Sequence, residues 1–259
     1  MTLTMGGGPL STTPPATVNY EITGPEHRLF FQDFPRRVRA VLGGEVIVDT
    51  GEAKLLHESE MLPQLYVPEK GLRTELLQPS EHTTTCPFKG QARYWSVRAG
   101  DRVVDNAAWA YDELWWMRGY VAIAWEAMDA WYDEAEVVHG HLRDPYHRVD
   151  VRASSRRVRV RLDGQIIADT TAPMVLSETG LPNRLYIAQK DIRMDVLEAS
   201  PTRTFCPYKG EAAYWSLRLG EEHLDDVAWS YPDPLENALK AARHLCFAHE
   251  RLTIEELLV

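Results

Sequence analysis

The chain has 259 residues, a formal net charge of −10 and a pI near 5.4. This charge disfavours a general binder of nucleic-acid backbones, which needs a net basic face. No stretch is apolar for long enough to span a bilayer, so neither nucleic acid nor a membrane is an expected partner. Three cysteines, Cys86, Cys206 and Cys246, form no C-x-x-C pair. They therefore indicate neither a disulfide framework nor a thiolate zinc site, and favour a reducing, cytoplasmic location.

The first thirty residues are rich in Gly, Pro and Thr. They lack the basic and apolar regions of a secretory signal. A segment of this composition cannot bury enough apolar surface to fold alone. We therefore expect residues 1–30 to form a disordered or extended leader.

Most of the remaining chain is one unit repeated with a shift of 120 residues. When Arg37 is aligned with Arg157, 31 of the 75 positions up to Tyr111 are identical and no gap is needed. The sequence predicts a first repeat at 37–135, a linker at 136–156 and a second repeat at 157–252. Matched residues should occupy equivalent places in two similar lobes. The chain is then a monomer with internal pseudo-two-fold symmetry, or a weak homodimer.

Each repeat opens with the signature of a β-hairpin. Alternating apolar residues at 38–42 and 158–162 precede a Gly-Gly or Asp-Gly pair, which turns the chain into a second strand. Short apolar runs then follow at intervals of about ten residues, separated by Gly and Pro, as is typical of antiparallel sheets.

The end of each repeat carries a helical pattern, at 113–134 and 234–251. In the first repeat this segment holds four tryptophans that are absent from the second: Trp115, Trp116, Trp125 and Trp131. The expected fold class is therefore mainly β with α: two tandem domains, each with antiparallel sheets and a C-terminal helix.

Two features of the linker region suggest binding but have simpler explanations. Arginines crowd at 152–161, and their alternation favours a solvated strand face. His139, His141 and His147 match no established metal-binding spacing, so a solvated linker is the favoured interpretation. No histidine is found at matching positions in the two repeats, which leaves a catalytic cysteine without an obvious base.

The polar residues kept in both repeats are the first candidates for chemistry. Glu58 and Glu178 precede a tyrosine-containing strand, where they can lie at the rim of a site. Lys89 and Lys209 can bind an anionic group as point charges, or can pair with these glutamates or with Asp105 and Asp225. Asp49 and Asp169 are expected to make local hydrogen bonds at the end of the hairpin.

The lysines belong to a C-P-[FY]-K-G string that also contains Cys86 and Cys206. Either the thiol is a nucleophile with a pKa lowered by the lysine, or it is a small buried filler beside a turn. The second interpretation is favoured. Five aromatic pairs can line a pocket for a flat ligand or fill the core, and core packing is the commoner role: Tyr66/Tyr186, Tyr94/Tyr214, Trp95/Trp215, Trp109/Trp229 and Tyr111/Tyr231.

These motifs resemble the domain-of-unknown-function 427 family of bacterial and fungal domains. The resemblance rests on G-x-[IV]-[IV]-x-D-T in the hairpin, T-x-C-P-[FY]-K-G-x-A-x-Y-W and A-W-x-Y, and covers most of each repeat. It implies a fold similar to the β-tent of the cereblon ligand-binding domain and of methionine sulfoxide reductase B. Those relatives hold zinc with two C-x-x-C pairs, which this chain lacks, so no metal or other cofactor is expected. The family has also carried a nucleotidyltransferase-like label, which none of these residues supports.

The sequence therefore favours a protein with a cleft in each repeat for a small, partly planar polar molecule. Trp109/Trp229 and Tyr94/Tyr214 would form the walls, with Tyr66/Tyr186 and Cys86/Cys206 beside them. An enzymatic version is a metal-independent hydrolase or isomerase, in which Glu178 is the acid/base and Lys209 and Tyr231 stabilise negative charge, with Glu58 and Lys89 equivalent in the first repeat. The alternatives are a non-catalytic binding module and a structural pseudo-dimer.

Overall fold

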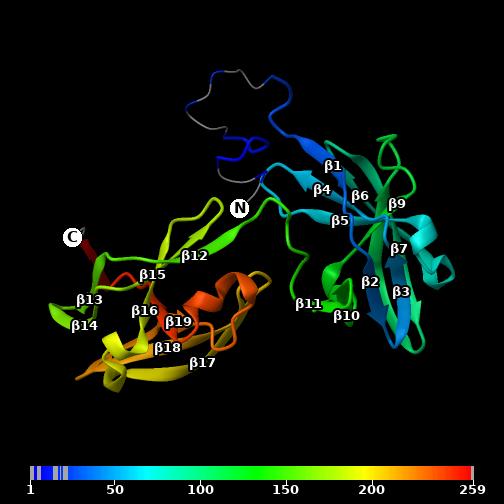
Figure 1. Cartoon of the computed structure of the whole chain (residues 1–259). Helices are drawn as coiled ribbons and strands as arrows, with labels where there is room; N and C mark the ends of the chain where they lie inside the picture. The colour runs from blue at the N-terminus through cyan, green and yellow to red at the C-terminus, as the bar shows by residue number, and fades with distance from the viewer. Residues whose placement is uncertain (1–2, 5–6, 14–16, 18, 20–22, 258–259) are drawn as a thin grey trace. The chain divides into compact units, whose positions relative to one another are not determined.

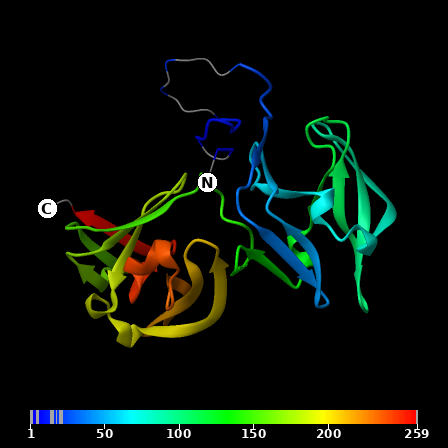
Figure 2. The ribbon, with the colours of Figure 1, turned by 45° about the vertical axis from the view of Figure 1, so that its right-hand side comes forward.

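The computed structural model describes residues 3–4, 7–13, 17, 19 and 23–257. The chain divides into two compact units, Met1–Asp144 and Pro145–Val259. Each unit contains one large and one small antiparallel sheet (Figures 1 and 2). The expected mainly β, antiparallel architecture in two halves is confirmed.

The first unit has a large sheet in the order β1-β4-β5-β9-β8-β7-β6 and a small sheet in the order β11-β10-β2-β3. Its strands are β1 (Leu29–Asp33), β2 (Val38–Leu42), β3 (Glu45–Thr50), β4 (Lys54–Glu58), β5 (Gln64–Pro68), β6 (Leu77–Cys86), β7 (Gly90–Ala99), β8 (Arg102–Tyr111), β9 (Tyr120–Ile123), β10 (Ala130–Asp133) and β11 (Glu136–Val138).

The large sheet of the second unit has the same strand order, β12-β15-β16-β20-β19-β18-β17, whereas its small sheet has three strands in the described residues, in the order β14-β13-β21. Its strands are β12 (Val149–Ala153), β13 (Arg157–Leu162), β14 (Gln165–Thr170), β15 (Met174–Glu178), β16 (Arg184–Ala188), β17 (Leu197–Cys206), β18 (Gly210–Leu219), β19 (Glu222–Ser230), β20 (His244–Phe247) and β21 (Leu252–Leu257).

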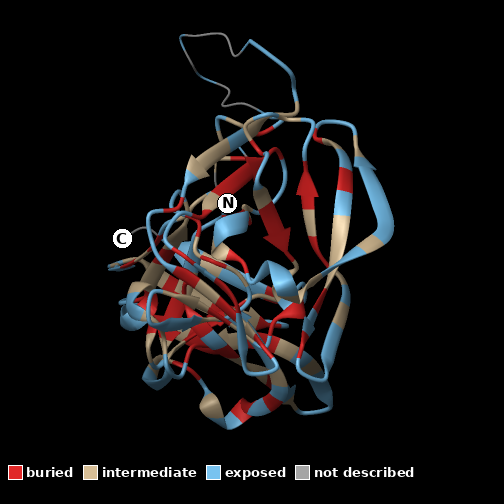
Figure 3. Cartoon of the chain, turned by 90° about the vertical axis from the view of Figure 1, so that its right-hand side faces the viewer, coloured by how far each residue is buried: buried red, intermediate tan, exposed pale blue. Residues whose placement is uncertain are grey.

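The large sheet of each unit carries a cluster of buried residues on each of its two faces. Alternate residues of a strand point to opposite faces, and in β20 Leu245 and Phe247 join the core beneath the small sheet, whereas Cys246 joins a second cluster. Buried residues lie mainly along the strands, whereas exposed residues lie both along the strands and in the connections (Figure 3). The second cluster contains the aromatic residues kept in both repeats, such as Tyr186 and Tyr231. Candidate site residues thus lie on the face away from the small sheet.

The prediction of a C-terminal helix in each unit is wrong. Helical structure in the described part of the chain consists of short 3₁₀ turns: Glu69–Gly71, Thr74–Leu76, Trp125–Ala127, Gln189–Asp191, Met194–Val196 and Glu236–Ala241. None of the described helices has the length and hydropathy of a membrane span.

The misleading helical pattern has a physical cause. β9 lies between β5 and β8 in the large sheet, so Val121, Ala122 and Ile123 are buried without alternation. A short strand that is buried on both faces cannot be told from a buried helix by periodicity. Gly119, with φ of +78°, ends the preceding turn just before this strand.

Regular structure also extends into the segment expected to be a linker. β11 lies at its start and β12 near its end. The expected leader falls partly outside the described residues. In its described part Thr4 and Ser11 are buried, and the Thr4 hydroxyl donates a hydrogen bond to the Met61 carbonyl at 3.0 Å.

Candidate functional site

A buried carboxylate in the second unit binds two basic side chains. Glu178, the last residue of β15, accepts a hydrogen bond from Lys209 Nζ at 2.5 Å on Oε2. Its Oε1 lies 2.9 Å from His147 Nε2. All three side chains are largely buried, with exposures of 6% for His147 and 11% for the other two. One acidic and two basic groups thus form a compact ionic cluster.

The first unit contains the same cluster at equivalent positions. Glu58 ends β4, binds Lys89 Nζ through Oε2 and lies 2.8 Å from His27 Nε2 through Oε1. The neighbouring backbone also matches: Arg28 N–H donates to Ser59 Oγ at 3.0 Å, as Arg148 N–H donates to Thr179 Oγ1 at 2.9 Å. The structure therefore brings the predicted Glu and Lys pairs together and adds a histidine to each.

The histidine pair corrects the sequence interpretation. His147 is neither a solvated linker residue nor without a counterpart, because His27 precedes it by the same 120 residues. The repeat extends upstream of Arg37. Twelve residues upstream, Pro25, His27 and Arg28 match Pro145, His147 and Arg148, and continuing the alignment would have found the pair.

The C-P-[FY]-K-G string forms the turn that places the lysine. It joins β17 to β18, with Cys206 opposite Gly210 in the ladder and Lys209 N–H bonded to the Cys206 carbonyl at 3.2 Å. Gly210 has φ of +99°, which side chains disfavour. A Cβ there would lie 3.0 Å from the Asp233 carbonyl. The glycine is therefore required for both the turn and its close packing.

The aromatic residue of the same string contacts the histidine. The Tyr208 and His147 rings lie 4.3 Å apart, and Phe88 stacks on His27 at 3.7 Å with an interplanar angle of 7°. The cysteines of the string are half-buried members of the adjoining aromatic clusters, in agreement with the filler interpretation. One short turn thus supplies both the cation and the ring that hold the cluster together.

The electrostatics of the second cluster favour a permanently ionised carboxylate. Burial alone would raise the pKa of Glu178, but hydrogen bonds from His147 and Lys209 and their charges outweigh it and lower the pKa to about 2. Burial raises the pKa of the Tyr231 phenol well above its usual range. At neutral pH Glu178 is therefore an anion, and Tyr231 is a hydrogen-bond donor.

Some residues of the aromatic pairs are fully buried, and others are only half-buried. Tyr66 and Tyr186 are each 1% exposed, and the Tyr186 hydroxyl accepts a hydrogen bond from Trp229 Nε1 at 3.0 Å. Tyr214 and Trp229 are half-buried, with ring centroids 6.4 Å apart; the Tyr94 and Trp109 rings are 6.3 Å apart. Each of the two tyrosine hydroxyls is hydrogen-bonded to a threonine at an equivalent position. Tyr214 Oη lies 3.1 Å from Thr204 Oγ1, and Tyr94 Oη lies 3.0 Å from Thr84 Oγ1.

In the second unit these residues surround a cleft of about 370 Å³. Polar and aromatic side chains converge on it, and it is lined by Leu176, Glu178, Leu181, Arg184, Tyr186, Lys209, Tyr214, Asp226, Trp229, Tyr231 and Ala248. Most of the predicted second-repeat site residues are in this wall.

Two cleft residues were missed because they differ between the repeats. Arg184 replaces Gln64, and its guanidinium carbon lies 5.6 Å from the centre of the Trp229 ring. Asp226 replaces Asn106; it accepts a hydrogen bond from Thr202 at 2.8 Å, and its Oδ1 is buried without a partner. A comparison that selects only shared residues cannot find them.

The other candidate carboxylates lie outside the cluster. Asp105 and Asp225 are exposed, so the lysines pair with the glutamates instead. Asp169 makes cross-strand ion pairs rather than local hydrogen bonds, accepting from Arg157 at 2.8–2.9 Å and from Arg159 at 2.9 Å.

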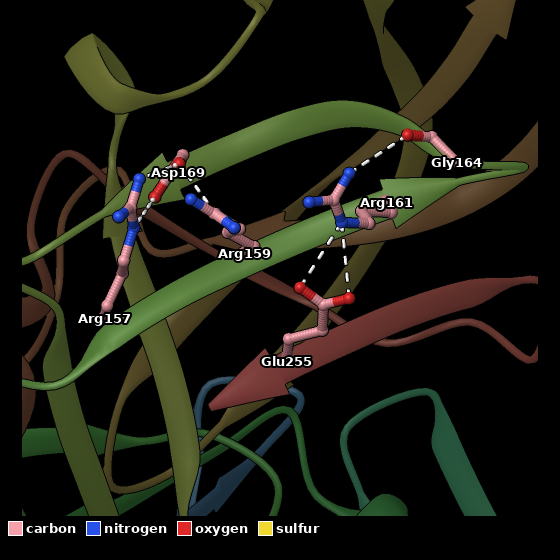
Figure 4. A network of polar contacts seen from close by, with 6 residues as sticks. All are labelled: Arg157, Arg159, Arg161, Gly164, Asp169 and Glu255. Atoms are coloured by element: carbon pink, nitrogen blue, oxygen red, sulfur yellow. Dashed lines mark hydrogen bonds and ion pairs between the residues drawn. The ribbon is translucent and has the colours of Figure 1, made fainter. Parts of the chain in front are cut away.

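Figure 4 shows the arginine row on β13 and its carboxylate partners. Arg161 contacts Glu255 at 3.3 Å on the other side of the strand from Asp169. Each arginine of the row is thus paired with a carboxylate of its own sheet, as expected for a solvated strand face. Within the described part of the chain, no group of three or more His, Cys, Asp and Glu side chains is placed to hold a metal ion.

The sequence profile of a family described as a domain of unknown function, DUF427, matches residues 30–134 and 150–257. The chain belongs to this family. Both DUF427 matches begin within the first strand of a unit and include the Glu and Lys of its cluster. Among curated proteins, none matches the chain.

Proposed function

We propose that this tandem DUF427 protein binds a small, partly planar polar molecule in the cleft of its second unit. The observation that carries the proposal is the convergence of Glu178 and Lys209 with Tyr214, Trp229 and Tyr231 on one concavity of about 370 Å³. Apolar walls with a few fixed polar groups are typical of small-molecule sites. We also propose that each unit has a fold similar to the β-tent.

The charges of the cleft indicate what the ligand carries. Arg184 lies over the Trp229 ring and is exposed, so it can meet an anionic group while a ring stacks on Trp229. Asp226 also lines the cleft, and its carboxylate carries a charge opposite to that of Arg184. A flat ligand with both an acidic group and an N–H or O–H donor would satisfy the cleft.

A second candidate is a metal-independent hydrolase or isomerase that uses the same cleft. The protonated Tyr231 and the cationic Lys209 favour this version, because both can donate hydrogen bonds to a developing negative charge. Glu178 has two basic partners and a pKa of about 2. In this version it holds Lys209 and His147 in place, rather than exchanging protons itself.

The experiment is a thermal-shift screen of polar metabolites with the full chain, followed by titration of the compounds that raise Tm. Trp229→Leu should abolish the shift, whereas the matched variant Trp109→Leu in the first unit should retain it. Compounds that bind both variants equally would place the ligand outside this cleft. For the enzymatic version, full turnover in both Lys209→Ala and Glu178→Ala would exclude the assigned roles.

A further inference from the structure

The core between the two sheets of the first unit is closed by an indole ring. Trp131 lies on β10 opposite Ala40 and is 3% exposed. It stacks on Trp125 at 4.5 Å with an interplanar angle of 11°, and its Nε1 donates to the Trp125 carbonyl at 3.0 Å. Trp131 thus belongs to the same core cluster as Val38, Leu65 and the other residues between the sheets.

The register of the strands identifies the equivalent position in the second unit. Trp131 faces Ala40 in the first small sheet, and Ile254 faces Val160, which matches Ala40, in the second. Trp125 likewise matches His249, because each lies at the start of the same turn. The Trp125 carbonyl accepts a hydrogen bond from Met128 N–H, and the His249 carbonyl accepts one from Leu252 N–H. The offset here is no longer 120 residues, because the second unit has extra residues after Tyr231.

The second unit has lost both tryptophans of this stack. Ile254 is 40% exposed, in contrast to the buried Trp131. Val160 is larger than its counterpart Ala40 by two methyl groups, but these fill only part of the volume that an indole ring occupies. The space is left as a pocket of about 220 Å³ between the sheets.

The wall of this pocket combines apolar and polar groups. Six of its residues are aliphatic or aromatic side chains of four strands: Val158, Val160, Leu185, Ile187, Phe247 and Ile254. Of the remaining lining residues, Glu256 is held in an ion pair with Arg156 at 2.8 Å. Asn183 Oδ1 accepts a hydrogen bond from Ser177. Cys246 and Arg184 complete the wall, and Arg184 also lines the polar cleft. The pocket therefore offers six apolar side chains for contact with a ring, together with polar groups.

We propose that this inter-sheet pocket of the second unit is a binding site for a neutral, indole-sized aromatic ring. An aromatic ligand would give the six apolar side chains the packing contacts that the indole ring supplies in the first unit. The strands that enclose it are the ones that enclose Trp131 in the first unit, so the fold itself accommodates a ring there. The site differs from the polar cleft in all of its lining residues except Arg184, which lines both.

Indole is the probe for this site. Titration of the full chain by calorimetry should show saturable binding, and indole should raise Tm, because a ligand that binds only the native state stabilises it. Ile254→Trp supplies the ring covalently. It should weaken indole binding at least tenfold and raise Tm in the absence of indole.

Two further variants separate this site from the cleft and from misfolding. Trp229→Leu alters the cleft and should leave indole binding unchanged, whereas Trp131→Ile should create a second indole site in the first unit. Unchanged indole affinity in Ile254→Trp would overturn the proposal. So would a loss of indole binding in Trp229→Leu alone, which would place indole in the cleft, or an absence of saturation in the wild type.

Discussion

Glu178 shows how one buried charge is made tolerable. A carboxylate removed from water needs partners on both oxygens, and His147 and Lys209 supply them. The recurrence of the same arrangement around Glu58 indicates that the cluster is needed for the fold, whatever else it does. Removing one partner would leave the others buried and uncompensated, which is the costly case.

The lowered pKa of Glu178 predicts how stability depends on pH. Its pKa is about 2 in the folded chain and near its ordinary value of 4.5 in the unfolded chain. Between these values the unfolded state binds more protons, so the contribution of Glu178 is complete above about 4.5 and is lost as pH falls toward 2. Glu178→Gln should therefore be less stable than the wild type at neutral pH, by about 2 kcal/mol.

Urea denaturation of both proteins from pH 2 to pH 7 measures this effect. The difference in the free energy of unfolding should narrow as pH falls through the window. Other carboxylates, including Asp169 with its pKa of about 2, titrate in both proteins and cancel in the difference. A difference that stays constant down to pH 2 would show that the charge of Glu178 contributes nothing.

At the scale of the element, the turn between β17 and β18 decides where the cluster lies. Tyr208 and Lys209 project from three residues between the paired Cys206 and Gly210. Because the turn also packs on the chain after β19, through the bond from Leu235 N–H to the Lys209 carbonyl at 3.1 Å, its conformation has little freedom.

Gly210→Ala tests this constraint. The added Cβ would lie 3.0 Å from the Asp233 carbonyl oxygen, and the alanine would have to adopt a positive φ of +99°. We expect a loss of about 2 kcal/mol in the free energy of unfolding, since each strained backbone position costs about 1–3 kcal/mol, together with weaker binding in the cleft.

Gly220→Ala is the matched control, because Gly220 also has a positive φ of +63° but open space around its Cβ. It should show the smaller backbone cost alone and unchanged ligand affinity. Equal stability losses in the two variants would mean that the contact with Asp233 has no effect on this turn.

At the scale of the whole molecule, the two units share a fold but differ in their cavities. The cluster and the strand order of the large sheet are the same in both. Arg184 and Asp226 of the cleft are replaced by Gln64 and Asn106 in the first unit. Duplication therefore preserved the residues that hold the sheets and allowed the surrounding walls to change.

This asymmetry predicts one cleft ligand per chain. A compound found in the thermal-shift screen should titrate with a stoichiometry of one, and Arg184→Gln, which copies the first unit, should reduce its affinity about tenfold through loss of a charged contact. The reciprocal Gln64→Arg serves as the control and should leave the second-unit affinity unchanged. A stoichiometry of two would show that both units bind it alike.

The amino-acid sequence by itself determined the duplication, the β-hairpins and the pairing candidates Glu178 and Lys209. An ungapped repeat and the alternation of apolar residues in a strand can both be recognised from the order of residues along the chain. It could not reveal that β9 and β20 are strands, since their burial on both faces depends on neighbours distant in the chain. Only the tertiary structure placed His147 on Glu178 and left Ile254 beside an open pocket. Contacts of this kind depend on where strands meet in space, which spacing along the chain does not encode.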